Sequence, residues 1–435
     1  MTSADKIVLT VNSALQRAQS SAAASVFVAF DGPRMKRELE EARSRHLEDR
    51  ALGPLDGCPI AIKANVNLAG RRTHAGSVAY HPTPAKQDAE IVQRLSRAGA
   101  VVLGHTNMSE FAFSGLGLNP HFGTPVNGME HGKQLVPGGS SSGSASAVAL
   151  GIADYSIGTD TSGSVRVPAA YQGLVGFRPS MNRYSVEGIF PLAPSLDVPG
   201  PITRTVSQAV LLDQILSGHL PAKPLNFSNL TFVVPSEISF GPVDEEVLQG
   251  VLATIEQLQI CGARIVRREV EALMETRAAF AEYGTLVAAE ARETLSQFVD
   301  LNDPRIDVRV RKRLESASGM TGDDVARLRS EKQRLEAKIK QELQGSLLLM
   351  PTTPMSPPSL HDVCGNDEVF AEVNARTLSL AMLGAFLNMP TVALPAVKNS
   401  RWISLSIGGA AGQDTMVLGA ALTVESVLES KCQAD

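Results

Sequence analysis

Two serine-rich segments hold the residues whose types and spacing could do chemistry. The first reads PGGSSSGSA over residues 137–145, and the second reads GTDTSGSVRVPAA over residues 158–170. In the second segment, small residues lie where a strand-like run meets a helix-like run. Successive backbone N–H groups at such a junction can converge on an anion, and the helix dipole adds to their attraction. We therefore predict an oxyanion hole with Ser164 as the nucleophile at its edge. The alternative is an ordinary turn with a capping serine.

A nucleophilic serine needs a base, and Lys63 is the candidate. It ends the apolar run PIAIK at residues 59–63 and is followed by uncharged residues. Burial at the end of a strand would lower the pKa of this lysine, so that its neutral amine could accept a proton. A lysine that extends to the surface is the alternative. The eight histidines are scattered without an HExxH motif, and none has an obvious role.

Other catalytic motifs are missing or incomplete. The sequence contains no G-x-x-x-x-G-K-[ST] phosphate loop, and no G-x-G-x-x-G follows a strand-like run. The one G-x-S-x-G match, at residues 139–143, lies before a helix-like run, but Pro137 interrupts the weak strand that precedes it. These patterns argue against a nucleotide-binding loop, a Rossmann site and the nucleophile elbow of an α/β-hydrolase.

The surrounding pattern predicts the elements that must position these residues. Residues 89–104 and 245–266 each contain an amphipathic helix, a glycine and a short β-branched run, which is typical of α/β proteins. Residues 322–345 form the clearest helix, which we interpret as a solvated helix over a core rather than a coiled coil. Short apolar runs predict six further strands. These are Pro59–Lys63, Tyr155–Gly158, Leu230–Val234, Leu347–Met350, Thr391–Leu394 and Ile403–Ile407.

The composition is that of a globular protein from a reducing compartment. The chain has 435 residues, of which 43% are hydrophobic and 20% charged, and its net charge is −5. No basic patch would attract nucleic acid or an acidic membrane surface, and no secretory signal or membrane-spanning apolar run is visible. We therefore expect a cytoplasmic protein with neither nucleic acid nor a membrane as partner. Its cysteines form no CxxC pair, which disfavours a zinc site or a disulfide framework. They are Cys58, Cys261, Cys364 and Cys432.

Three segments together resemble the amidase signature family of serine hydrolases in order and in spacing. They are PLDGCPIAIKAN, VPGGSSSGSASAVALG and SIGTDTSGSVRVPAAYQGLVGFRPS. The resemblance extends from about residue 51 to residue 206, is weaker at 349–425 and is slight at 207–348. It implies one large α/β domain over 1–435, with a central mixed sheet covered by helices on both faces. Within it we expect a signature core at 51–206, a variable helical substrate region at 207–348, and closing strands and a helix at 349–430.

The resemblance also implies a catalytic triad of the Ser-cisSer-Lys type. Its lysine falls on Lys63, its middle serine on Ser140 and its nucleophile on Ser164, and the two serines are 24 positions apart. The Gly139–Ser140 peptide bond would be cis. No metal or organic cofactor is implied. The oxyanion hole would consist of the backbone N–H groups of Thr161, Ser162, Gly163 and Ser164.

The resemblance implies an amidase that hydrolyses the C–N bond of a small-molecule amide. The products would be a carboxylate and ammonia or an amine, released through a Ser164 acyl-enzyme. One alternative is a glutaminase-type subunit that supplies ammonia in a multi-subunit amidotransferase. Another is an inactive amidase-fold scaffold or binding protein, which the retention of all three triad residues disfavours. Family members are often dimers, so a homodimer is one expected state. Aryl, aliphatic and urea-derived amides all stay open as substrates.

Several neighbouring residues add expectations about the substrate and the loop. Two positions depart from the family pattern, because Ala64 stands where aspartate is frequent and Ser162 where glycine is frequent. Asp160 and Arg166 are expected to pair and brace the second serine-rich segment. For the aromatic candidates among the substrate contacts, ordinary core packing is the alternative. The candidate substrate contacts are Phe111, Phe113, Gly138 and Gly139.

Overall fold

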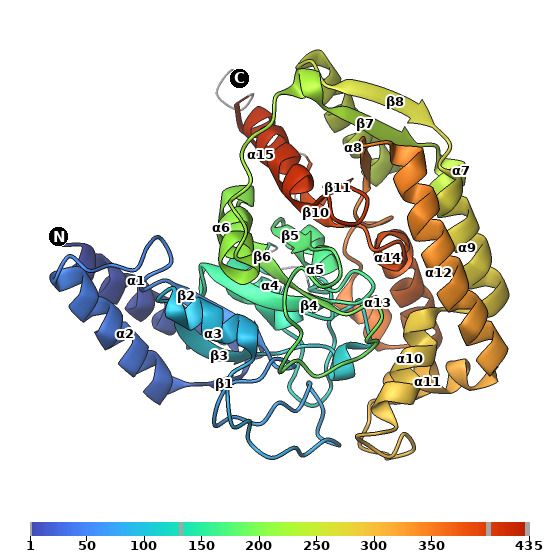
Figure 1. Cartoon of the computed structure of the whole chain (residues 1–435). Coiled ribbons are helices and arrows are strands. Elements are labelled where there is room, and N and C mark those ends of the chain that lie inside the picture. The colour runs from blue at the N-terminus through green and yellow to red at the C-terminus, as the bar shows by residue number, and fades with distance from the viewer. Residues whose placement is uncertain (1, 130–133, 397–401, 431–435) are drawn as a thin grey trace.

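One twisted sheet runs through the molecule. The structure, a computed structural model, describes residues 2–129, 134–396 and 402–430. Within these ranges, eleven strands form a sheet in the order β1-β3-β2-β4-β6-β5-β10-β11-β9-β7-β8 (Figure 1). The strands are β1 (Phe27–Phe30), β2 (Pro59–Lys63), β3 (Val101–Thr106), β4 (Tyr155–Asp160), β5 (Val175–Arg178), β6 (Val198–Thr203), β7 (Thr231–Pro235), β8 (Arg264–Arg268), β9 (Leu347–Pro351), β10 (Thr391–Pro395) and β11 (Ser404–Gly408).

Helices surround this sheet, and α12 and α9 of the variable region pack against each other at one side (Figure 1). The helices of the described ranges are α1 (Ser3–Ala18), α2 (Gly32–Leu47), α3 (Glu90–Arg97), α4 (Ser142–Ala149), α5 (Arg166–Tyr171), α6 (Val206–Ser217), α7 (Glu237–Phe240), α8 (Glu245–Ile260), α9 (Glu271–Tyr283), α10 (Leu286–Leu295), α11 (Val308–Ser316), α12 (Gly322–Leu343), α13 (Leu360–Cys364), α14 (Asp367–Phe386) and α15 (Asp414–Ser430). No helix among them combines the length and the apolar character that a membrane crossing needs.

The sheet is mixed, as expected. Strand β2 is parallel to both β3 and β4, and β7 is parallel to both β8 and β9. Between these two parallel groups the strands β6, β5, β10 and β11 alternate in direction. The carboxyl ends of parallel neighbours meet at the same edge, so each parallel group presents one edge where several strands end together.

Helices cover both faces of the sheet, which confirms the predicted fold class. One core cluster joins the sheet to α3, α6, α8 and α15, and a second joins it to α9, α10, α12 and α14. Successive residues of a strand belong to opposite clusters: Phe232 and Val234 to the first, and Val233 to the second. Since side chains alternate along a strand, a strand buried on both faces must be apolar throughout.

The strand and helix predictions agree with the structure to within about two residues. All six predicted strands are present, as β2, β4, β7, β9, β10 and β11. Both helix–glycine–strand segments form, and Gly99 and Gly262 have φ angles of 89° and 97°, the left-handed conformation expected after a helix. The predicted helix over residues 322–345 is α12, and its buried stripe lies over the core rather than against a coiled-coil partner.

Strand β6 shows why some strands were not predicted from the sequence. It pairs with β4 and β5 in the middle of the sheet, yet it contains Pro199 and Pro201. Proline lacks the N–H that a central strand donates, so a sequence with two prolines argues against a central strand. The short strands β1 and β5 were also not predicted.

Candidate active site

The candidate residues lie where β2 and β4 end. Lys63 is the last residue of β2, and the second serine-rich segment begins with the last three residues of β4, which ends at Asp160. Because β2 and β4 are parallel neighbours, in the register Ile62 opposite Ile157, both ends lie at the same edge of the sheet. The first serine-rich segment enters α4, which packs on β2, β4 and β6. The sheet therefore brings together three segments that are distant in the sequence. Lys63 is 77 positions before Ser140 and 101 before Ser164, and the two serines are 24 positions apart.

Lys63 is completely buried. Its Nζ donates to Ser140 Oγ at 2.7 Å and to Thr159 Oγ1 at 2.8 Å, with a longer contact of 3.4 Å to the Thr159 carbonyl. Burial lowers the pKa of Lys63 to about 7, although the carboxylates of Asp160 and Asp197 act in the opposite direction. The structure thus supplies the desolvation on which the sequence argument for a basic amine depends.

Ser140 follows a tight turn that only glycines can make. The Gly139–Ser140 peptide bond is cis, as the resemblance implies. A Cβ at Gly139 would lie 2.5 Å from the Gly117 backbone N, and one at Gly138, where φ is +75°, would lie 2.7 Å from Pro168 Cα. These close approaches explain why both positions are glycine, since any side chain would collide with the neighbouring backbone. They give Gly138 and Gly139 a packing role, and their contact with substrate stays a prediction.

Ser164 is tied through its backbone to the segment that carries Ser140. Its carbonyl accepts a hydrogen bond from the Ser141 N–H at 3.3 Å, which ties the two serine-rich segments together. Ser164 is 3% exposed, and its hydroxyl makes no hydrogen bond to any residue that the structure describes. The Lys63–Ser140 contact is therefore formed, whereas the Ser164 hydroxyl is unengaged. Catalytic hydrogen bonds are often absent or long before substrate binds.

The predicted oxyanion donors divide into two kinds. The Gly163 N–H donates to Asp160 Oδ1 at 2.8 Å, so this donor already has a partner in the structure, and its place in an oxyanion hole stays a prediction. The backbone N–H groups of Thr161, Ser162 and Ser164 make no hydrogen bond with another described residue. Gly163 has a φ of +130°, and a Cβ there would lie 2.7 Å from Ala381 Cβ. Gly163 therefore allows the loop to take this conformation, and the free backbone N–H groups are those of Thr161, Ser162 and Ser164.

Asp160 organises this loop through two buried arginines. Arg166 donates to both carboxylate oxygens at 3.0 Å, which confirms the expected Asp160–Arg166 pair. Arg178 of β5 adds a contact of 3.0 Å to Oδ1 and a short hydrogen bond to the Asp160 carbonyl, which the sequence did not predict. Burial alone would raise the pKa of Asp160, but the two guanidinium groups outweigh it and hold that pKa below its ordinary value.

A second carboxylate, Asp197, was not predicted as part of the site. The Thr161 hydroxyl donates to its Oδ1 at 2.5 Å, and the backbone N–H groups of Leu192 and Ala193 donate to its Oδ2 at 2.8 and 3.0 Å. Burial raises the pKa of Asp197 to about 6 against these hydrogen bonds. The signal available in the sequence was the segment PLAPSLDVPGPITRTV, in which Asp197 is the acidic residue.

The two candidate phenylalanines lie in packed surroundings. Phe111 is 1% exposed, has a φ of +51° and stacks near Phe190 with the ring centroids 6.1 Å apart. The Arg313 guanidinium covers the Phe113 ring at 4.0 Å and donates to the Phe113 carbonyl at 2.9 Å. Their predicted contact with substrate therefore stays a prediction, and core packing accounts for what the structure contains.

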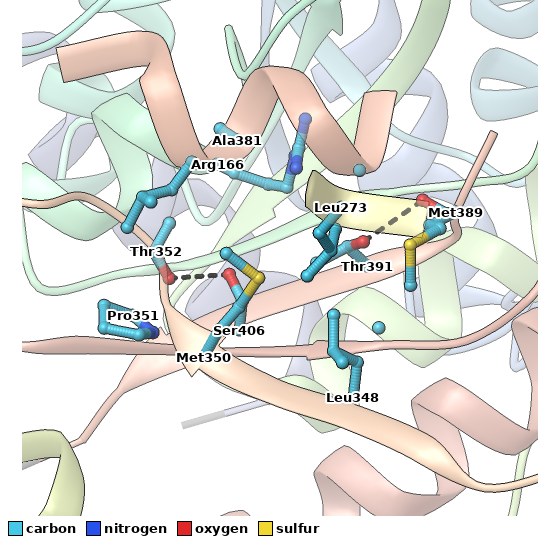
Figure 2. A pocket seen from close by; sticks show the side chains of 13 residues that line it. Arg166, Leu273, Leu348, Met350, Pro351, Thr352, Ala381, Met389, Thr391 and Ser406 are labelled. Carbon is cyan, nitrogen blue, oxygen red and sulfur yellow. Dashed lines mark hydrogen bonds between the residues drawn. The ribbon is translucent and has the colours of Figure 1, made fainter. Parts of the chain in front are cut away.

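Two cavities adjoin the loop that carries Ser164. One, of about 90 Å³, opens beside the Thr161 and Asn65 side chains. Its lining contains no lysine or arginine, and its walls are largely apolar, among them Ala112, Ile189, Phe190, Leu192 and Pro194. The other lies behind the loop, where Arg166 and Ala381 face Met350 and Leu348, and where Thr352 and Ser406 share a hydrogen bond of 2.9 Å (Figure 2).

Comparisons with known proteins agree on the family. A family model described as Amidase matches residues 7–418. A 2-amino-5-chloromuconic acid deaminase from Comamonas testosteroni is 32% identical over 93% of this chain and 88% of its own length. A mandelamide hydrolase from Pseudomonas putida is 31% identical over 86% of this chain and 79% of its own length. A crystal structure of an amidase superposes with a TM-score of 0.84 and 30% identity, over 98% of this chain and 96% of the other.

Proposed function

The chain belongs to the amidase family and is a hydrolase of carbon–nitrogen bonds, and from this premise we propose that it cleaves a small-molecule amide through an acyl-enzyme on Ser164. The observation that carries the proposal is the contact of 2.7 Å between Lys63 Nζ and Ser140 Oγ inside a completely buried site. A buried lysine whose pKa is about 7 is neutral in a large fraction of molecules at neutral pH, and its amine can then accept a proton.

The first half of the reaction is a proton relay that activates the nucleophile. Neutral Lys63 takes the proton of the Ser140 hydroxyl, and Ser140 takes the proton of Ser164. The Ser164 Oγ then attacks the amide carbonyl carbon. The relay needs a hydrogen bond between the two serine hydroxyls, which we expect to form when substrate fills the site. The shared backbone contact between Ser141 and Ser164 supports this, because it holds the two segments at a short separation.

The second half concerns the developing charge and the leaving group. The negative oxygen of the tetrahedral intermediate accepts hydrogen bonds from the free N–H groups of Thr161, Ser162 and Ser164. As the C–N bond breaks, the proton returns through Ser140 to the leaving nitrogen, which departs as ammonia or an amine. Water then attacks the Ser164 ester through the same relay. It releases the carboxylate and restores the free serine, so the protein's own groups are sufficient for each step.

The surroundings favour an uncharged amide over glutamine. Glutamine carries an α-carboxylate and an α-ammonium, which need charged or strongly polar partners. The cavity beside Thr161 contains no cation, and its one carboxylate, Asp197, already accepts three hydrogen bonds. An amide with an aryl or alkyl substituent would instead contact the apolar walls formed by residues such as Ile189 and Phe190.

A fluorophosphonate probe tests the nucleophile directly. We expect one covalent adduct, detected by intact-protein mass spectrometry, on the wild type and none on Ser164→Ala. Ser162→Ala is the matched control, because it removes a neighbouring hydroxyl but keeps the backbone N–H, and it should still be labelled. Absence of labelling in folded wild-type protein would overturn the proposal.

A substrate panel tests the amide class. Ammonia release and product masses are measured with aryl, aliphatic and urea-derived amides and with glutamine. We expect turnover of an aryl or aliphatic amide. Turnover of glutamine alone would replace the proposal with the glutaminase alternative.

The cellular setting and assembly stay predictions. The three cysteines within the described ranges, Cys58, Cys261 and Cys364, are free thiols, which supports a cytoplasmic location; Cys432 lies outside those ranges. A homodimer stays an expectation from the family, and light scattering of the purified chain would test it.

A further inference from the structure

A large cavity lies at the edge of the sheet where β7, β8 and β9 end. Its volume is about 430 Å³, and the last residues of all three strands contribute to its lining: 234–236, 267–269 and 349–351. The three strands are mutually parallel neighbours in the order β9-β7-β8. The region outside the carboxyl ends of parallel strands is where open α/β sheets bind ligands. We call this space the α8 cavity, because α8 connects β7 to β8 and forms its roof.

The interior of the α8 cavity is apolar. Leu248, Val251, Leu252 and Ile255 line it from one stripe of α8, at the spacing that places side chains on a single helix face. Leu248 and Leu252 are only half-buried, so the stripe is not completely covered by the protein. From below, Val234, Phe240 and Leu349 complete the apolar surface. A volume of this size falls in the range of about 300–1,000 Å³ that is typical of small-molecule sites.

One cation at the rim has no partner. Arg267 is exposed, and its guanidinium makes no hydrogen bond or ion pair with any described residue. Its neighbour Arg268 donates to the carbonyls of Glu269 and Glu342 instead. Strand alternation places Arg267 on the same face as Ile265, which packs against the core under α8. The free guanidinium therefore belongs to the side of β8 that faces the cavity.

The charges around the rim select a singly charged anion. Arginine pairs with carboxylates and phosphates through its fork of N–H donors. Here a single free arginine is accompanied by Glu269, which also lines the cavity and would repel a dianion. Arg268 also lines the cavity, but its guanidinium donates to the carbonyls of Glu269 and Glu342, so Arg267 is the arginine left for a ligand. A carboxylate attached to an apolar body matches this arginine, the neighbouring Glu269 and the apolar interior.

This cavity is separate from the candidate active site. None of its lining residues belongs to the predicted triad or to the oxyanion loop. In Figure 1, β7, β8 and α8 lie at the opposite end of the sheet from β2. Only Met350 and Pro351 are shared with the small cavity of Figure 2, which lies on the other side of β9.

We propose that the α8 cavity binds a monoanionic amphiphile, with its carboxylate on Arg267 and its acyl or aryl body beneath α8. The site is independent of the amide-cleaving residues, so it does not rest on the proposed catalytic function. The ligand class follows from the shape and charge of the cavity: a medium-chain fatty carboxylate has one negative charge and an alkyl body of suitable size.

Calorimetric titration with decanoate tests the proposal, with decanol as the neutral counterpart. We expect wild-type protein to bind decanoate at one site and decanol at least about tenfold more weakly, since a hydrogen-bonded charge is lost. Arg267→Gln should weaken decanoate binding at least about tenfold. The matched control is Arg264→Gln, an exposed arginine of the same strand that does not line the cavity, and it should bind like the wild type.

A second variant fills the space instead of removing the charge. Leu252→Trp should abolish decanoate binding, because the half-buried side chain can extend into the cavity. Circular dichroism checks that each variant is folded, and fluorophosphonate labelling, which should be unchanged in Arg267→Gln and Leu252→Trp, checks the distant site. The proposal is overturned if wild-type protein does not bind decanoate. It is also overturned if Arg267→Gln and Leu252→Trp, both folded, bind decanoate as the wild type does.

Discussion

The carboxyl ends of β2 and β4 and the carboxyl ends of β7, β8 and β9 are two edges of one sheet, and their surroundings differ. At the first edge, a lysine and several serines are completely buried, and Lys63 hydrogen-bonds with Ser140 and Thr159. At the second edge, the walls are apolar, and the Arg267 guanidinium lies at the exposed rim, with no hydrogen bond or ion pair to another described residue.

The difference shows that burial determines whether a basic side chain can act as a catalytic base or can only bind an anion. A buried Lys63 changes its pKa and becomes a base, whereas an exposed Arg267 keeps its charge and can only attract an anion. The topology is similar at both edges. The residue type and the depth of burial decide what each edge can do.

The largest expected effect is the loss of the buried base. Lys63→Ala should lower kcat/KM by about 10²–10⁴-fold at neutral pH, the contribution typical of general acid–base catalysis. Steady-state kinetics with the amide from the substrate panel measure it, and Lys86→Ala, an exposed lysine, is the control. A folded Lys63→Ala variant with near wild-type turnover would show that the base is another group.

The next largest effect is the loss of stability when a buried arginine of the first edge is replaced, which can be compared with the replacement of the exposed arginine of the second edge. Arg178→Met should lower the free energy of unfolding by about 3–5 kcal/mol, because it leaves a buried carboxylate with one cation fewer. Arg178 is fully buried and contacts Asp160 at 3.0 Å. Urea denaturation followed by circular dichroism measures the change. A loss below about 1 kcal/mol would mean that Arg166 alone satisfies Asp160.

A smaller effect concerns the pH dependence of the first edge. Catalysis needs neutral Lys63, so kcat/KM should rise with pH as the pH passes about 7 and should fall below it. The Asp197 carboxylate raises the pKa of Lys63. Asp197→Asn should therefore move this rise to lower pH. The pH profiles of both proteins measure the shift, and an unmoved or upward-shifted profile would contradict the electrostatic link.

The smallest expected effect is at the second edge. Arg267→Gln should change the free energy of unfolding by no more than about 0.5 kcal/mol, because an exposed side chain without partners contributes little to stability. The same urea titration used for Arg178→Met measures it. A loss comparable to that of Arg178→Met would mean that Arg267 has a structural role, and the contrast between the two edges would fail.

Much of the fold was predictable because its signals are local. Apolar runs such as PIAIK and LLLM marked buried strands, and a glycine after each amphipathic helix marked the helix end. Strand β6 was not predictable in this way, since its prolines contradict its central place and only its pairing with β4 and β5 explains it. Local propensity fails where tertiary pairing overrides it.

By itself, the sequence determined the types and local geometry of the reacting groups. Lys63 ends an apolar strand, and the glycines before Ser140 and Ser164 permit the turns that precede them. Tertiary structure alone decided which partners they meet. The Lys63–Ser140 bond spans 77 positions, and Asp160 reaches Arg178 only because β4 and β5 flank β6. It also decided that the Gly163 N–H donates to the Asp160 carboxylate. The physical reason is the distance along the sequence over which each interaction acts. Turns depend on adjacent residues, whereas the desolvation and hydrogen bonding of a group depend on every element that packs around it.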